Sequence, residues 1–156
     1  MSILARYRKP GGFIQLLKLI ETSQPVKQAK LLEVVEQEDP GMADLLRQKK
    51  ITPEMALAWD PGHLVVVFEN MVPGHLVCLF QHMGRESLKD YSTLFRPEKY
   101  REIKQLLDEK EENEVPSDGA VIAAKTHMLE TIRFLDQEKK LRLNQIDPEL
   151  DVSDAA

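Results

Sequence analysis

Three side chains that can bind a metal ion lie on one stretch of sequence that is predicted to be helical. His75, Cys78 and His82 are spaced at i, i+3 and i+7, so all three can point the same way from one helix. Because zinc accepts nitrogen and sulfur ligands, this spacing supports the hypothesis of a small metalloprotein. The alternative is that Cys78 is a small buried residue and that the two histidines meet solvent at opposite ends of the helix. We favour this alternative, since about two helical turns between the histidines is long for one ion.

Catalytic chemistry has less support in the sequence. His63 and His75 occupy equivalent places in an internal repeat, which favours a structural role over a catalytic pair. No serine or cysteine lies in a nucleophile motif, and Gly11-Gly12 alone lacks the spacing of a loop that cradles phosphate. The sequence therefore predicts a protein that is not an enzyme and that uses no cofactor.

A helix with charges of both signs is predicted from Arg96 to Glu112. One interpretation is a solvated face with i, i+4 ion pairs, each worth about 0.2–0.5 kcal/mol. The other is a docking surface whose charges steer a partner protein more than they hold it. Both interpretations stay open on the sequence alone. The proposed partner-binding residues are Glu98, Arg101, Glu102, Lys104 and Asp108.

The centre of the fold is predicted to be the repeated segment from Asp60 to Met83. Pro-Gly-His-Leu-Val occurs at residues 61–65 and again at residues 73–77. Proline suits the first turn of a helix, so each copy is predicted to start a short helix. Apolar residues then follow at helical spacing in both copies, which indicates two buried helices. The core and repeat-stacking positions are Leu64, Phe68, Met71, Leu76, Phe80 and Met83.

The rest of the chain is also predicted to be helical. Apolar stripes and start signals indicate helices near residues 13–20, 25–36, 40–50, 53–59, 85–94 and 97–112, with a longest helix after Ser117. No sustained period-two strand is found. We therefore expect an all-α fold of armadillo- or HEAT-like stacked helical repeats followed by a C-terminal helical bundle. The expected divisions are a flexible basic lead (1–10), a helical half-repeat (11–50), a second helical region (51–143) and an acidic disordered tail (144–156).

Composition limits the class of partner. The 156 residues suffice to bury a core, and the net charge of −5 argues against nucleic acid, whose phosphates bind clustered Lys and Arg. One cysteine excludes an internal disulfide and fits a reducing compartment. No run approaches the ~18 apolar residues of a membrane helix, so no direct membrane insertion is expected. A cytoplasmic protein with protein partners is the resulting prediction.

The order of these signals resembles the middle and C-terminal regions of the flagellar motor switch protein FliG. The resemblance depends on Gly11-Gly12 before an apolar helix and on the segment 32–43, which contains Glu38-Asp39-Pro40. Two short apolar helices, a charged helix and a long helix after Pro-Ser-Asp continue it, over roughly residues 11–140. The family is an armadillo-like part of the bacterial rotor. The resemblance implies a non-catalytic scaffold with flagellar or other motility partners, held near the inner membrane through a partner.

The resemblance also implies self-association. Residues 13–49 would stack on residues 52–83 of the same or a neighbouring subunit, with Gln48–Thr52 as the hinge. The chain departs from the family by lacking the N-terminal domain and the Glu-His-Pro-Gln docking motif. Lys104-Gln105 also stands where the family has adjacent acidic residues, and Phe80 stands near an expected lysine. We therefore expect a truncated or repurposed paralogue. A helical-repeat adaptor that holds a peptide and is unrelated to motility is the alternative.

Overall fold

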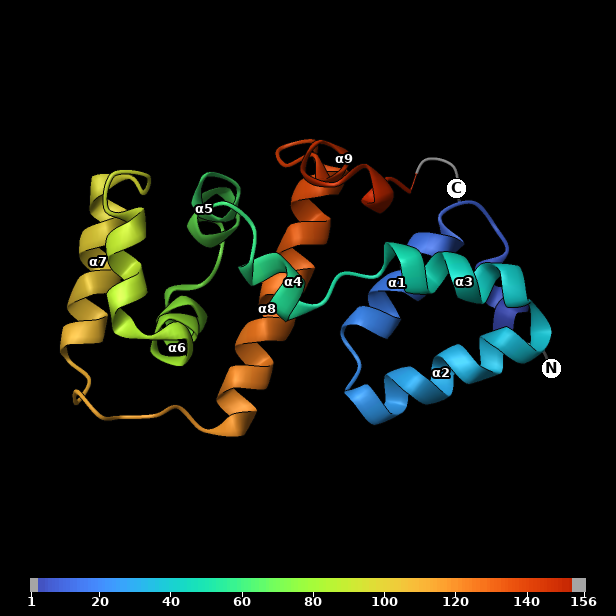
Figure 1. Ribbon diagram of the computed structural model, residues 1–156, viewed down its shortest axis with the longest axis horizontal. Helices are drawn as coiled ribbons and strands as arrows, with labels where there is room; N and C mark the ends of the chain where they lie inside the picture. The colour runs from blue at the N-terminus through green and yellow to red at the C-terminus, as the bar shows by residue number, and fades with distance from the viewer. Residues whose placement is uncertain (1–2, 153–156) are drawn as a thin grey trace. The chain divides into compact units, whose positions relative to one another are not determined.

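The computed structural model describes residues 3–152, and every regular element in that range is helical. The all-α prediction is confirmed. The described chain divides into two compact units, one formed by residues 3–52 together with residues 142–152, and the other by Pro53–Leu141. The first unit contains the 3-10 helix η1 (Ile3–Tyr7), α1 (Gly12–Glu21), α2 (Pro25–Glu38), α3 (Pro40–Lys49), α9 (Leu143–Ile146) and η3 (Pro148–Leu150) (Figure 1). The second contains α4 (Pro53–Leu57), α5 (Pro61–Glu69), α6 (Pro73–Met83), η2 (Arg85–Tyr91), α7 (Pro97–Asp108) and α8 (Asp118–Gln137).

Local sequence signals account for most helix starts. Proline lies in the first turn of α2, α3, α5, α6 and α7, where its missing N–H leaves no intrahelical partner unsatisfied. Asp39 caps α3 by accepting a hydrogen bond from the Met42 N–H at 3.1 Å, and Ser117 caps α8 through the Ala120 N–H at 3.1 Å. Both helices therefore begin where a side-chain acceptor satisfies a free backbone donor.

The core of the first unit is built on the predicted stripe of α1. Phe13, Leu16, Leu17 and Ile20 are buried, and they pack with residues of α2 and α3 and with Leu4 of η1. Glu21 at the end of α1 is also buried, and its Oε2 accepts a hydrogen bond from the Ile51 N–H at 2.8 Å. This bond ties the segment after α3 to α1.

The two glycines before α1 have separate steric roles. Gly11 has φ of +80°, a left-handed conformation that glycine adopts without a Cβ clash. Gly12 lies against η1, where an added Cβ would overlap the carbonyl group of Tyr7. The Gly12 N–H also donates to the Lys9 carbonyl oxygen at 2.9 Å. The pair therefore serves a tight turn that allows close packing of η1 on α1.

Both ends of the described chain differ from the expected flexible lead and disordered tail. Leu4 in η1 is fully buried, because η1 packs on α1 and α2. Leu150 in η3 is 1% exposed, and η3 packs on α3. Val152 packs against the core of the first unit, so residues 144–152 are built into this unit despite their acidic composition. Residues 1–2 and 153–156 of the predicted lead and tail lie outside the described residues.

The second unit is organised around α6, which packs against α7, α8 and η2 (Figure 1). Phe68 of α5 and Phe80 of α6 are fully buried and meet edge to face, with ring centroids 5.4 Å apart. Tyr91 and Phe95 complete an aromatic cluster around them, with centroids 5.3 and 6.4 Å from that of Phe68. None of the helices in residues 3–152 is both long and apolar enough to cross a membrane.

Candidate functional site

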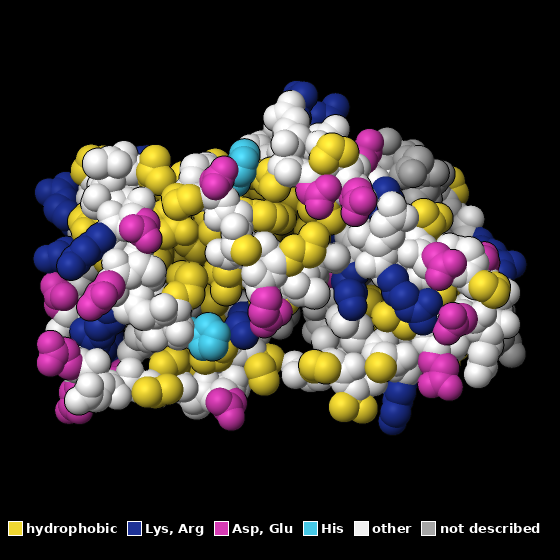
Figure 2. All heavy atoms as spheres, viewed as in Figure 1, with side chains coloured by type: hydrophobic (Ala, Val, Ile, Leu, Met, Phe, Trp, Pro, Cys, Tyr) yellow, Lys and Arg dark blue, Asp and Glu magenta, His cyan; other side chains and the backbone are white. Residues whose placement is uncertain are grey.

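The charged outer face of α7 is the first candidate site. Ile103 and Leu107 anchor the inner side of this helix, at 0% and 3% exposure, which directs the opposite side of the helix to solvent. All five predicted docking residues are exposed: Glu98, Arg101, Glu102, Lys104 and Asp108. Figure 2 shows charged side chains of both signs gathered over α7. Arg101, Lys104 and Asp108 also line one open depression with Gln105 and Glu109.

Contacts within this face are weak. Lys104 Nζ lies 3.9 Å from Asp108 Oδ2, which is an ion pair beyond hydrogen-bonding distance between two exposed side chains. Arg101 Nε donates to the Pro97 carbonyl oxygen at the long distance of 3.4 Å. Their charged groups can therefore turn to a partner at small cost.

The helix beneath these charges is tied firmly to the rest of the second unit. Glu69 of α5 accepts two hydrogen bonds from Arg96 at the start of α7, from the backbone N–H at 2.7 Å and from Nε at 2.6 Å. Lys99 Nζ donates to the Met71 carbonyl oxygen at 3.1 Å, so Lys99 supports the helix instead of extending the charged face. The weakly held charged groups of α7 therefore extend from a helix whose backbone is held in place by Glu69 and Lys99.

The candidate metal ligands are not brought together. Cys78 is 8% exposed, and burial raises the pKa of its thiol. His82 is exposed at the end of α6, whereas His75 lies beside His127 of α8. Within residues 3–152, no group of three or more His, Cys, Asp or Glu side chains has the arrangement of a metal site. The hypothesis of a small metalloprotein therefore gains no support from His75, Cys78 and His82.

The contact between His75 of α6 and His127 of α8 was not predicted from the sequence. The rings of His75 and His127 have centroids 4.8 Å apart, and His127 Nε2 accepts a hydrogen bond from the Val72 N–H at 3.1 Å. Neutral His127 must therefore carry its proton on Nδ1. Burial lowers the pKa of His127, the neighbouring His75 lowers it further, and Glu130 opposes them. No local pattern marks His127, because its partners lie far away in the chain.

We expect acid to weaken the α6–α8 contact through His127. Its folded pKa is below the ordinary value of about 6.5, so its contribution to the free energy of unfolding is complete above that pH and is lost as pH falls through the folded pKa. Protonation also places a hydrogen on Nε2, which then cannot accept from Val72. Urea unfolding at pH 7 and pH 5 should show a smaller loss of stability in His127→Asn than in the wild type. His63→Gln, which leaves this contact in place, should behave as the wild type; equal losses in all three proteins would exclude His127 as the cause.

The repeat-stacking residues lie mainly in the interior of the second unit. Five of the six are buried, namely Leu64, Phe68, Met71, Leu76 and Phe80, while Met83 is half-buried at the end of α6. Figure 2 shows apolar side chains gathered between α5 and α6. Stacking against residues 13–49 stays a prediction.

Comparisons with protein-family models, with curated proteins and with solved structures give no significant match.

Proposed function

We propose that the chain is a non-catalytic protein–protein interaction scaffold whose docking surface is the exposed face of α7. The observation that carries this proposal is the set of five exposed charges on a helix whose opposite side is buried. Exposed charges contribute little to the stability of the helix that bears them. They contribute more by steering a partner of complementary charge during association.

The partner class comes from the sequence resemblance. We propose flagellar or other motility components, with the chain as a FliG-like paralogue located near the inner membrane through its partner. The run of short helices that begin with proline supports an armadillo-like repeat arrangement. Stacking of residues 13–49 on residues 52–83 of another copy would then give a homo-oligomer.

Charge reversal on α7 tests the docking surface. Arg101→Glu with Lys104→Glu should reduce capture of the partner from the native cell about tenfold at low salt, because two attractive charges become repulsive. The difference from the wild type should shrink at high salt, where exposed charges are screened. Quantitative mass spectrometry of the captured proteins at both salt concentrations measures the effect.

The matched control is Lys27→Glu with Lys30→Glu on α2, which makes the same change in net charge at exposed positions of the first unit. This variant should capture the partner as the wild type does. Equal capture by the wild type and the α7 variant at low salt would refute the α7 surface. Equal losses in both variants would show an effect of net charge alone.

A further inference from the structure

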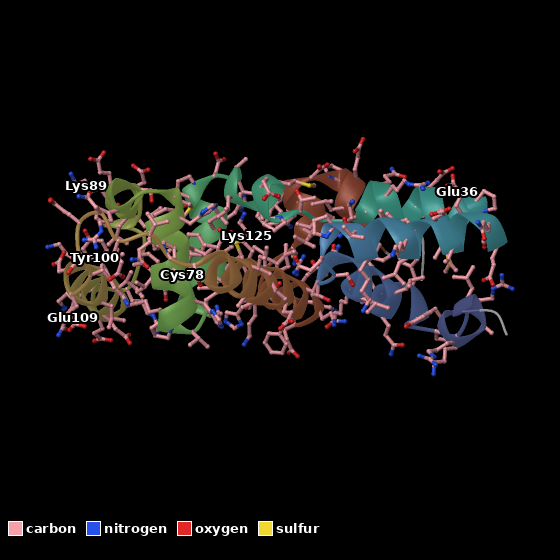
Figure 3. The ribbon with its side chains drawn as sticks, turned by 90° about the horizontal axis from the view of Figure 1, so that it is seen from below. Glu36, Cys78, Lys89, Tyr100, Glu109 and Lys125 are labelled. Carbon is pink, nitrogen blue, oxygen red and sulfur yellow. The ribbon has the colours of Figure 1, made fainter. Side chains whose placement is uncertain are left out.

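A half-open cavity of about 360 Å³ lies in the second unit, away from the charged face of α7. Figure 3 shows Cys78 on α6 between α7 and α8, whereas Glu109 is at the outer edge of the unit. At roughly 30 Å³ per water molecule, the cavity has room for about a dozen. Its volume falls in the range of small-molecule sites. The walls are mainly apolar and come from α6, α7, the segment between α7 and α8, and the start of α8: Gly74, Val77, Cys78, Leu106, Pro116 and Ala120.

Polar groups gather where the cavity meets the segment after α7. Glu114 Oε2 accepts a hydrogen bond from Gln81 Nε2 at 3.3 Å and lies 3.7 Å from Lys110 Nζ. The second contact exceeds hydrogen-bonding distance, and both charged side chains are nearly half exposed, at 45% for Lys110 and 43% for Glu114. Lys110 can therefore leave Glu114 for solvent at small cost.

The two charged residues that line the cavity are held unequally, which favours a cation in the place of Lys110. Glu114 is the acidic residue of the lining and Lys110 the basic one. Glu114 is held by the hydrogen bond from Gln81, whereas the contact of Lys110 with Glu114 is longer than a hydrogen bond. A cationic ligand can therefore replace Lys110 at a carboxylate that stays in place, while an anionic ligand would be repelled by that carboxylate.

We propose that this cavity binds a small amphiphilic amine, with the apolar body against Val77, Cys78 and Leu106 and the protonated amine paired with Glu114. The ligand would have about a dozen non-hydrogen atoms, from the cavity volume. Burial of its apolar body drives binding, and the carboxylate sets its orientation and charge preference.

Alkylation of Cys78 reports directly on occupation of the cavity, because Cys78 is the sole cysteine and lies in the cavity wall. Three probes share one phenylbutyl body and differ in the head group: 4-phenylbutylamine, 4-phenylbutanol and 4-phenylbutyrate. At ten times its Kd, the amine should slow alkylation of Cys78 by iodoacetamide about tenfold. The alcohol should protect less at equal concentration, and the carboxylate least. No protection by any probe, or equal protection by amine and carboxylate, would overturn the proposal.

Two substitutions distinguish direct pairing of the amine with Glu114 from a general effect of nearby negative charge. Glu114→Gln should abolish the preference for the amine over the alcohol, whereas Glu112→Gln, an exposed acid outside the cavity wall, should preserve it. An unchanged preference in Glu114→Gln would exclude the assigned pairing.

The repeated Pro-Gly sequence provides a second variant with a matched control, at Gly74 and Gly62. A Cβ at either Gly74 or Gly62 meets no atom within 4 Å, but of the two only Gly74 lines the cavity. Gly74→Leu should therefore eliminate amine binding in isothermal titration calorimetry, and Gly62→Leu should bind as the wild type. Wild-type binding by a folded Gly74→Leu would place the ligand elsewhere and overturn the proposal. The glutamate variants decide the matter independently if Gly74→Leu fails to fold.

Discussion

Gly12→Ala should lower the free energy of unfolding of the first unit by about 3 kcal/mol or more, the upper range for inserting a methyl group into a packed site. The added Cβ would overlap the carbonyl group of Tyr7 and lie 2.8 Å from its Cα. Backbone atoms cannot rotate away as a side chain can. Relief therefore requires η1 to move off α1, which would remove fully buried Leu4 from the core.

The control for this substitution is Gly62→Ala in the first turn of α5. A Cβ there meets no atom within 4 Å, so alanine should be neutral or raise the free energy of unfolding by about 0.5–1 kcal/mol. Urea unfolding followed by circular dichroism reports both units. Fluorescence of Trp59, the only tryptophan, reports the second unit directly. An unchanged circular dichroism transition in Gly12→Ala would show that η1 does not pack tightly on α1.

Helix positions were predictable because their signals are local. Asp39 and Ser117 cap the helices that the sequence assigns to them. Ser23 and Asp60 also lie just before helices that begin with proline, but neither side chain caps α2 or α5. The Ser23 hydroxyl instead donates to the Leu19 carbonyl oxygen at 2.6 Å, at the end of α1. A hydroxyl can donate or accept, so which helix it serves depends on the path of the chain.

Features that depend on distant contacts were not predictable. Leu150 lies in an acidic, polar segment that reads as disordered, yet it is buried because η3 packs on α3. His127 accepts its hydrogen bond from Val72, 55 residues earlier in the chain. The cavity beside Cys78 also draws its walls from α6, α7 and α8. By contrast, the exposure of the charged α7 residues followed from helical periodicity alone.

Phe80→Ala should lower the free energy of unfolding of the second unit by about 3–5 kcal/mol, as expected for truncation of a buried phenylalanine. Phe80 lies in the second half of α6 and is fully buried. Its ring centroid lies 5.4 Å from that of Phe68, 5.6 Å from that of Tyr91 and 6.5 Å from that of Phe95. Truncation removes these edge-to-face contacts and leaves a cavity that three rigid rings cannot fill by small movements.

Phe134→Ala is the matched control, because it makes the same chemical change in the same unit at a side chain that is 53% exposed. Its expected cost is below about 1 kcal/mol, since an exposed side chain loses little burial and leaves no cavity. Both variants can be measured by urea unfolding with Trp59 fluorescence, with the slope checked for constancy. Equal costs would mean that the aromatic cluster does not hold the second unit together. A large loss of unfolding free energy in Phe80→Ala alone would show that the aromatic cluster stabilises α6. This helix packs against α7 and forms part of the cavity wall, so the candidate docking surface and the cavity both depend on it.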